Sequence, residues 1–115
     1  MTVLILDNNL IWSAKLARSV RALGHEPVLM EKLPDEWPAA DLAILNLGNP
    51  TLFSGEIVST LRDKGIKTLA HAGHKEQPLL EAGNSCGCDR VVTNGTITHK
   101  LGDLLAEMNP EPYQK

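Results

Sequence analysis

The chain has 115 residues, of which 43% are hydrophobic and 22% charged, and its formal net charge is −3. That length suits one domain, because single domains cluster around roughly 100–150 residues. The charge excludes the strongly basic surface typical of nucleic-acid binders, and aromatic residues, at 3%, leave few platforms for stacking bases. We therefore expect one small domain without a nucleic-acid partner, whose core consists of Leu, Ile, Val and Ala.

No apolar run approaches the roughly 20 residues that span a bilayer. The first residues, MTVLILD, lack a basic segment, and an acid interrupts their apolar run, which is unlike a secretory signal peptide. The sequence therefore predicts a cytoplasmic protein that does not enter a membrane. The two cysteines, Cys86 and Cys88, are expected to stay reduced in that compartment.

The chain opens with an apolar segment at residues 3–6. It does not alternate polar and apolar residues, which is typical of a strand covered on both faces in a parallel sheet. Apolar residues then recur at spacings of three and four from Leu10 to Leu23, which predicts a helix that Gly24 ends. Asn9 is expected to cap this helix, because its side-chain oxygen can accept from amides of the first turn.

A second strand is expected at residues 28–30, and the segment after it has the weakest helical pattern of the chain. Pro34 and Pro38 limit any helix there to about one turn, because Pro lacks an amide donor and restricts the residue before it. Trp37 is predicted to fold over the sheet face that a missing helix leaves open. A third strand follows at residues 42–45.

Helices and strands continue to alternate after the third strand. A helical pattern at residues 57–61 ends at Gly65, and a strand is expected at residues 68–70. Residues 76–83 suit a short helix, and residues 84–87 suit a loop.

The last strand is predicted at residues 91–93 and is followed by the clearest helical pattern of the sequence, at residues 97–108. This pattern predicts one continuous helix, which Thr96 caps and which ends before Pro110. Residues 109–115 are expected to form a loose tail, so that a single domain covers residues 1–108.

The alternation of strands and helices predicts right-handed crossovers onto a parallel sheet. Five strands with helices on both faces give a flavodoxin-like α/β fold, a three-layer αβα sandwich with strand order 2-1-3-4-5. The second helix of that fold is shortened or missing here. Ligands of such sheets bind beyond the carboxyl ends of the strands, near the switch point between the first and third strands.

Four stretches of the sequence, VLILDNN, DLAILNLGNP, TLAHAGH and CGCDRVVTNG, together resemble the receiver domain of bacterial two-component response regulators, the CheY-like family. VLILDNN resembles the first receiver strand with its acidic pair, and DLAILNLGNP resembles the strand that carries the phosphoaccepting Asp. TLAHAGH resembles the strand that ends in Thr or Ser, and CGCDRVVTNG resembles the stretch with an aromatic switch residue and a Lys. The resemblance covers residues 3–108 and implies the flavodoxin-like fold and a role in signal transduction.

The positions that match the phosphorylation pocket of receivers lack the usual groups. Receiver chemistry needs a carboxylate nucleophile, further carboxylates that hold Mg²⁺, a hydroxyl and an ammonium. The acceptor position holds Asn46, and the acidic pair is reduced to Asp7 and Asn8. Ala72 stands at the hydroxyl position, and Asn94 stands at the Lys position. The resemblance therefore predicts a degenerate pocket that is not phosphorylated and holds no metal.

A retained scaffold without its phosphorylation chemistry indicates function at a surface. In receivers, the fourth helix, the fifth strand and the fifth helix form the usual output and dimer face. The residues of this chain expected on that face are Arg90, Val91, Thr93, Lys100 and Asp103. We therefore predict a stand-alone receiver-like domain, not an enzyme and without a cofactor, that binds a protein partner, with a homodimer as one form of that contact.

A second hypothesis is a small-molecule- or metal-binding flavodoxin-like domain, or an enzyme subunit. It rests on the polar strand ends and on Cys86 and Cys88 together with His71 and His74. Zinc sites favour two residues between paired cysteines, so the single residue between these two is a poor match. The alternative is that both cysteines fill small-residue positions, where receivers often have Ala.

Overall fold

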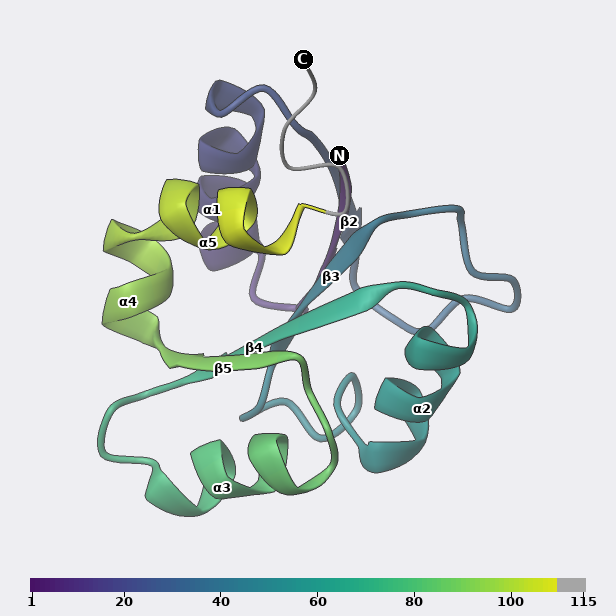
Figure 1. Cartoon of the computed structure of the whole chain (residues 1–115), viewed down its shortest axis with the longest axis vertical. Helices are drawn as coiled ribbons and strands as arrows, with labels where there is room; N and C mark the ends of the chain where they lie inside the picture. The colour runs from purple at the N-terminus through teal and green to yellow at the C-terminus, as the bar shows by residue number, and fades with distance from the viewer. Residues whose placement is uncertain (110–115) are drawn as a thin grey trace.

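The computed structural model describes residues 1–109 and contains a five-stranded parallel sheet (Figure 1). The strands are β1 (Thr2–Leu6), β2 (Glu26–Met30), β3 (Leu42–Asn46), β4 (Lys67–Ala72) and β5 (Arg90–Thr93). They are arranged in the order β2-β1-β3-β4-β5, and each neighbouring pair is parallel. The predicted strand order is therefore confirmed.

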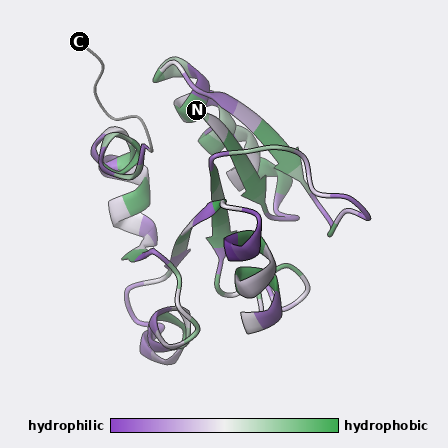
Figure 2. Cartoon of the chain, turned by 45° about the vertical axis from the view of Figure 1, so that its right-hand side comes forward, coloured by the Kyte–Doolittle hydropathy of each residue, from purple (hydrophilic) through white to green (hydrophobic). Residues whose placement is uncertain are grey.

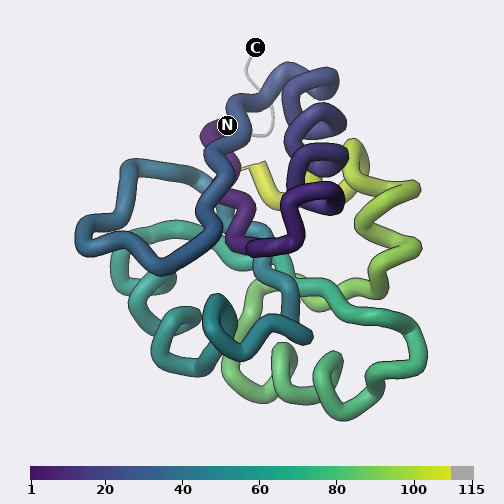
Figure 3. Tube along the Cα trace, turned by 180° about the vertical axis from the view of Figure 1, so that it is seen from behind, coloured from purple at the N-terminus to yellow at the C-terminus, as the bar shows by residue number. Residues whose placement is uncertain are grey.

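Helices cover both faces of this sheet. They are α1 (Leu10–Ala22), α2 (Gly55–Asp63), α3 (Gln77–Ser85), α4 (Asn94–His99) and α5 (Leu101–Met108). Figures 1 and 3 show α1, α4 and α5 on one side of the sheet, with α2 and α3 on the other. The fold is the predicted three-layer αβα sandwich.

Successive residues of the strands contribute to two separate cores, one on each face of the sheet. Ile5 and Ile44 pack in the core under α1, α4 and α5, which we call the α1-side core. Their neighbours Leu4 and Leu45 pack in the core under α2 and α3, which we call the α2-side core. The central strands are hydrophobic on both faces, whereas the helices that cover them are of mixed polarity (Figure 2). This is the pattern expected of a parallel sheet that is buried on both sides.

The connection between β2 and β3 contains no helix, as its prolines predict. Trp37 from this connection is half-buried and packs against the α2-side core. Val28 and Met30 of β2 pack against the same core. The prediction that Trp37 covers the face left open by the missing helix is confirmed.

Helix α1 begins and ends where the sequence predicts. The Asn9 side chain accepts a hydrogen bond from the Trp12 amide at 3.1 Å, which caps the first turn. Gly24 follows the helix with φ +90°, a left-handed conformation that favours glycine. Because α1 begins directly after this cap, Asp7 and Trp12 lie at the same end of the sheet.

The expected continuous helix at residues 97–108 is wrong. Lys100, with φ −123° and ψ 23°, separates α4 from α5. The cap is also wrong: Thr93, not Thr96, caps α4, and its hydroxyl accepts from the Thr96 amide at 3.2 Å. Because Thr93 also ends β5, the strand runs directly into α4 and places Asn94 at the edge of the sheet.

The predicted loose tail lies outside the described residues from residue 110 onward. Within residues 1–109, none of the helices combines the length and the apolar character that crossing a bilayer requires.

Candidate functional site

Two of the predicted pocket residues are in direct contact at the carboxyl ends of the strands. Asp7 follows β1, Asn46 ends β3, and these two strands are neighbours in the sheet. The Asn46 Nδ2 group donates a hydrogen bond to Asp7 Oδ2 at 3.1 Å. Asp7 is only 3% exposed, so this amide replaces water as a hydrogen-bond partner of a buried carboxylate.

The remaining polar atoms of this pair are bonded to the turns that follow the two strands. Asp7 Oδ1 accepts from the backbone amide of Asn9 at 3.1 Å, and Asn46 Oδ1 accepts from the backbone amide of Gly48 at 2.9 Å. The pair therefore fixes the conformation of both turns. Its polar groups are used within the protein.

Asn8 and Ala72 do not join this network. Asn8 is exposed, and its side chain makes no hydrogen bond to any residue in the range 1–109. Ala72 ends β4, is 3% exposed and packs in the α2-side core, so it brings no polar group to the strand ends. Across the same range, no group of three or more His, Cys, Asp or Glu side chains is placed to hold a metal ion.

Asn94 contacts a histidine, and no hydrogen bond joins it to Asp7 or Asn46 within the described part of the chain. Asn94 Oδ1 lies 2.7 Å from Nδ1 of His71 on β4. Because an amide oxygen can only accept, Nδ1 is the protonated nitrogen of the His71 ring. The position that the resemblance assigns to a Lys therefore holds an amide that orients a buried imidazole.

His71 is a site residue whose role the sequence pattern did not predict. It is 2% exposed, and its ring centroid lies 5.5 Å from that of Trp12 on α1. Burial lowers the pKa of His71 below its ordinary value, although the hydrogen bond to Asn94 and the charge of Asp7 both act to raise it. A polar residue inside the apolar β4 segment was the signal that could have identified it.

The side chains considered as zinc ligands are divided between the two faces of the sheet. His71 contacts Trp12 on the α1 side, whereas Cys86 and Cys88 are free thiols that pack against the α2-side core. Burial is the main cause that raises the pKa of Cys88 to about 12, so the group stays a neutral thiol. His74 is exposed. The cysteines therefore lie at the border of the α2-side core and do not form a joint site with His71.

The residues expected on a partner surface differ in exposure. Arg90 forms an exposed ion pair with Glu107 of α5, and Lys100 and Asp103 are also exposed. These charged side chains lie on β5, between α4 and α5, and in the first turn of α5.

Val91 and Thr93 are partly buried and have structural contacts. Val91 packs against the α2-side core, where its Cγ2 atom would meet a side chain at Gly83. Thr93 caps α4, as described above. The exposed part of the expected surface is therefore its charged part.

A scan of the sequence against protein-family models and a search of curated proteins find no match. Among solved structures, the chain is similar to the receiver domain of a Saccharomyces cerevisiae response regulator that was crystallised with a histidine phosphotransfer protein. The identity is 18% and the TM-score 0.79, over 96% of this chain and 90% of that chain.

It is also similar to a Francisella response regulator receiver domain, with 13% identity and a TM-score of 0.75 over 93% of this chain and 94% of that chain. A two-component response regulator from Clostridium difficile gives 15% identity and a TM-score of 0.74, over 95% of this chain and 98% of that chain. Together with the strand order, these likenesses show that the chain has the fold of response regulator receiver domains.

Proposed function

We propose that this chain is a receiver-like signalling domain that acts by binding a protein partner and is not phosphorylated. The observation that carries the proposal is the 3.1 Å hydrogen bond from Asn46 Nδ2 to Asp7 Oδ2. An amide donor stands where the resemblance places the nucleophile. A neutral carboxamide is a poor nucleophile for a phosphoryl group. In addition, the nitrogen of this carboxamide already donates a hydrogen bond to the carboxylate of Asp7.

The other strand-end residues support the same proposal. Phosphoryl transfer in a receiver needs Mg²⁺ held by several oxygen ligands with enough negative charge, and a cation that stabilises the transferred group. Asn8, Ala72 and Asn94 contribute no charge to this edge of the sheet. Without a site for the phosphoryl group, phosphorylation cannot bias a conformational equilibrium, so we expect the strand-end site to rest in one state with respect to phosphorylation.

Protein binding is supported by two exposed regions. The charged surface holds Lys100 and Asp103, and the first turn of α1 presents Leu10 and Ile11, which are 56% and 79% exposed. Adjacent apolar side chains on one helical turn are a common feature of contact surfaces. The similar yeast receiver domain was crystallised with a protein, which is consistent with a protein partner here.

The absence of phosphorylation is tested by treating the intact protein with acetyl phosphate and Mg²⁺ and measuring its mass. We expect no phosphoryl group on the native chain. The double variant Asn8→Asp, Asn46→Asp restores a carboxylate at the acceptor position and a second one beside Asp7, and we expect it to gain some phosphoryl mass. A phosphoryl adduct on the native chain would overturn the proposal.

The partner is tested by affinity purification from the source cells with the native chain and surface variants. We expect a protein that copurifies with the native chain and is lost with Lys100→Glu and Asp103→Lys together, or with Leu10→Ser and Ile11→Ser together. Lys64→Glu, a charge reversal at the end of α2, is the matched control. Equal recovery with all variants would contradict a contact at either surface.

A further inference from the structure

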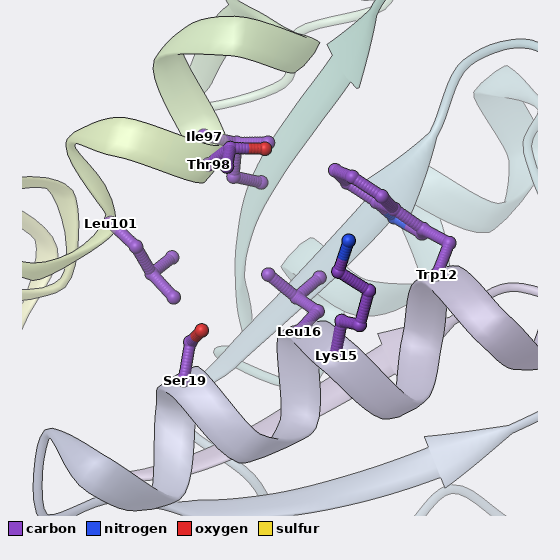
Figure 4. Close-up of a pocket in the computed structure, with 7 residues that line it drawn as sticks. All are labelled: Trp12, Lys15, Leu16, Ser19, Ile97, Thr98 and Leu101. Atoms are coloured by element: carbon purple, nitrogen blue, oxygen red, sulfur yellow. The ribbon is translucent and has the colours of Figure 1, made fainter.

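A cavity of about 160 Å³ lies between α1 and the α4–α5 pair, on the side of the α1-side core (Figure 4). Its apolar walls include Leu16, Ile97 and Leu101, which are buried to 95% or more as whole residues. Trp12 lines one end, and Lys15 lies at the rim. An engineered cavity of about 150 Å³ lined by Leu, Ile and Phe is large enough for benzene, so this space suits a single ring.

Two residues that line this cavity, Trp12 and Lys15, carry side-chain donors without an acceptor among residues 1–109. The Trp12 Nε1 group is buried and has no partner in the part of the chain that the structure describes. The Lys15 side chain makes no hydrogen bond or ion pair with residues 1–109. In Figure 4 the ammonium group of Lys15 points toward the Trp12 end of the cavity.

We propose that this cavity binds a small carboxylic acid that carries one apolar ring, for which benzoate is the simplest probe. The ring would fill the space between Leu16, Ile97 and Leu101. The carboxylate would accept from the Lys15 ammonium and, after a small adjustment of the indole, from Trp12 Nε1. Hydrogen bonds to a charged acceptor are stronger than those between neutral groups, and a buried donor without a partner is costly. A carboxylate can accept a hydrogen bond from each of the two donors.

Ligand chemistry of other kinds fits these walls less well. A neutral ring would leave both donors without an acceptor, and a free phosphate would place a strongly hydrated group against leucine and isoleucine. The charge complementarity with Lys15 and the volume of the space together select a ring-bearing carboxylate.

The cavity is connected to the strand-end site through Trp12. The Trp12 ring contacts His71, and His71 is hydrogen-bonded to Asn94. A ligand that moves the indole would therefore shift the environment of a residue at the ends of the strands. This inference goes beyond the proposed function, and it does not depend on it, because ligand binding can be measured without any protein partner.

The proposal is tested by titrating the ¹⁵N-labelled protein with benzoate and recording amide and indole NMR signals. We expect saturable shifts of the Trp12 indole N–H and of the amides of Leu16 and Ile97. Benzyl alcohol, which has the ring without the charge, should bind about five- to tenfold more weakly, the loss expected for one charge-assisted contact. Acetate, which has the charge without the ring, should give no saturable shift at these residues.

Variants of the protein test separately how much the carboxylate and the ring of the ligand contribute to binding. Lys15→Gln should weaken benzoate binding about five- to tenfold and leave benzyl alcohol binding unchanged. Arg18→Gln removes an exposed cation of the same helix that does not line the cavity, and it should leave both affinities unchanged. Ser19→Phe, at an exposed lining position, should fill the space and abolish both, with the NMR spectrum as the check that the variant is folded.

Three results would overturn the proposal. The first is the absence of saturable benzoate shifts at the cavity residues of the native protein. The second is equal affinity for benzoate and benzyl alcohol, which would remove the role of the carboxylate. The third is that only a protein partner, and not benzoate, changes the NMR signals of these residues. The cavity would then be a docking site for a side chain of that partner. Loss of the partner in the purification experiment would leave the benzoate result unaffected.

Discussion

The buried carboxylate of Asp7 depends on the amide of Asn46 beside it. Several carboxylates at one sheet edge repel one another and require a bound cation or a nearby ammonium group. Here the Asn46 amide donates to Asp7, so one negative charge is tolerated with hydrogen bonds alone. A lysine at the position of Asn94 would have less negative charge to balance, which fits the hydrogen bond that Asn94 instead makes with His71.

Asn46→Asp should lower the free energy of unfolding by about 1–3 kcal/mol at pH 7, because a donor to a buried carboxylate becomes a second negative charge. Urea denaturation at pH 7 measures this loss. Asn8→Asp, at an exposed position next to Asp7, is the control and should change the stability by less than about 0.5 kcal/mol. An equal loss with both variants would mean that the hydrogen bond is unimportant.

The lowered pKa of His71 gives stability a definite pH dependence. The unfolded chain binds this proton more readily than the folded chain, so the free energy of unfolding is highest above pH 6.5 and falls as the pH drops below that value. NMR titration of the imidazole should give a pKa below 6.5. His71→Gln should reduce the slope of the free energy of unfolding against pH between pH 5 and 7. His74→Gln, at an exposed position, should leave that slope as steep as in the native protein.

At the scale of elements, α3 lies close to the sheet because one of its residues is a glycine. An ideal Cβ atom at Gly83 would lie 3.1 Å from both Cδ atoms of Leu47 and from Cγ2 of Val91. These atoms belong to the α2-side core and its border, where neighbours have little room to move. The glycine therefore sets how closely α3 approaches β5.

Gly83→Val should lower the free energy of unfolding by about 1–3 kcal/mol, because the larger side chain overpacks this contact. Gly95→Val is a matched change in α4, where the nearest atom to an added Cβ is Thr93 Oγ1 at 4.0 Å. We expect that variant to change stability by less than about 0.5 kcal/mol. Urea denaturation compares the two, and equal effects would show that α3 can move away from the sheet at little cost.

At the scale of the whole molecule, the two cores share the strands that separate them. Trp12 packs against the α1-side core and Trp37 against the α2-side core, so each indole senses one face of the sheet. Because the strands contribute to both faces, loss of one core exposes apolar surface of the other. The domain should therefore unfold as one unit.

Single-tryptophan variants test this cooperativity. Trp37→Phe leaves Trp12 as the fluorescent probe, and Trp12→Phe leaves Trp37. In each variant we expect the fluorescence and the far-UV circular dichroism to give the same urea midpoint, as in a two-state transition. A fluorescence midpoint that differs from the circular dichroism midpoint in either variant would show that one face of the sheet unfolds before the other.

The sequence pattern predicts the fold well because the fold follows from local and repetitive signals. Apolar runs mark the strands, three- and four-residue spacings mark α1, and two prolines remove the helix between β2 and β3. The prediction of one continuous helix at residues 97–108 is wrong because hydrophobic spacing alone does not show where a backbone changes direction. The hydrophobic spacing at residues 97–108 is continuous, yet Thr93 caps α4 and the backbone changes direction at Lys100.

The sequence by itself determined the strand order, the missing helix and the predominance of uncharged residues at the strand ends, because each follows from residue types at fixed places along the chain. Only the tertiary structure decided which of these residues meet. Contacts between Asn46 and Asp7, between Asn94 and His71, and between His71 and Trp12 join strands and helices far apart in sequence. The same holds for the cavity beside Lys15, because its walls come from α1 on one side and from α4 and α5 on the other, and their separation depends on how the helices pack on the sheet.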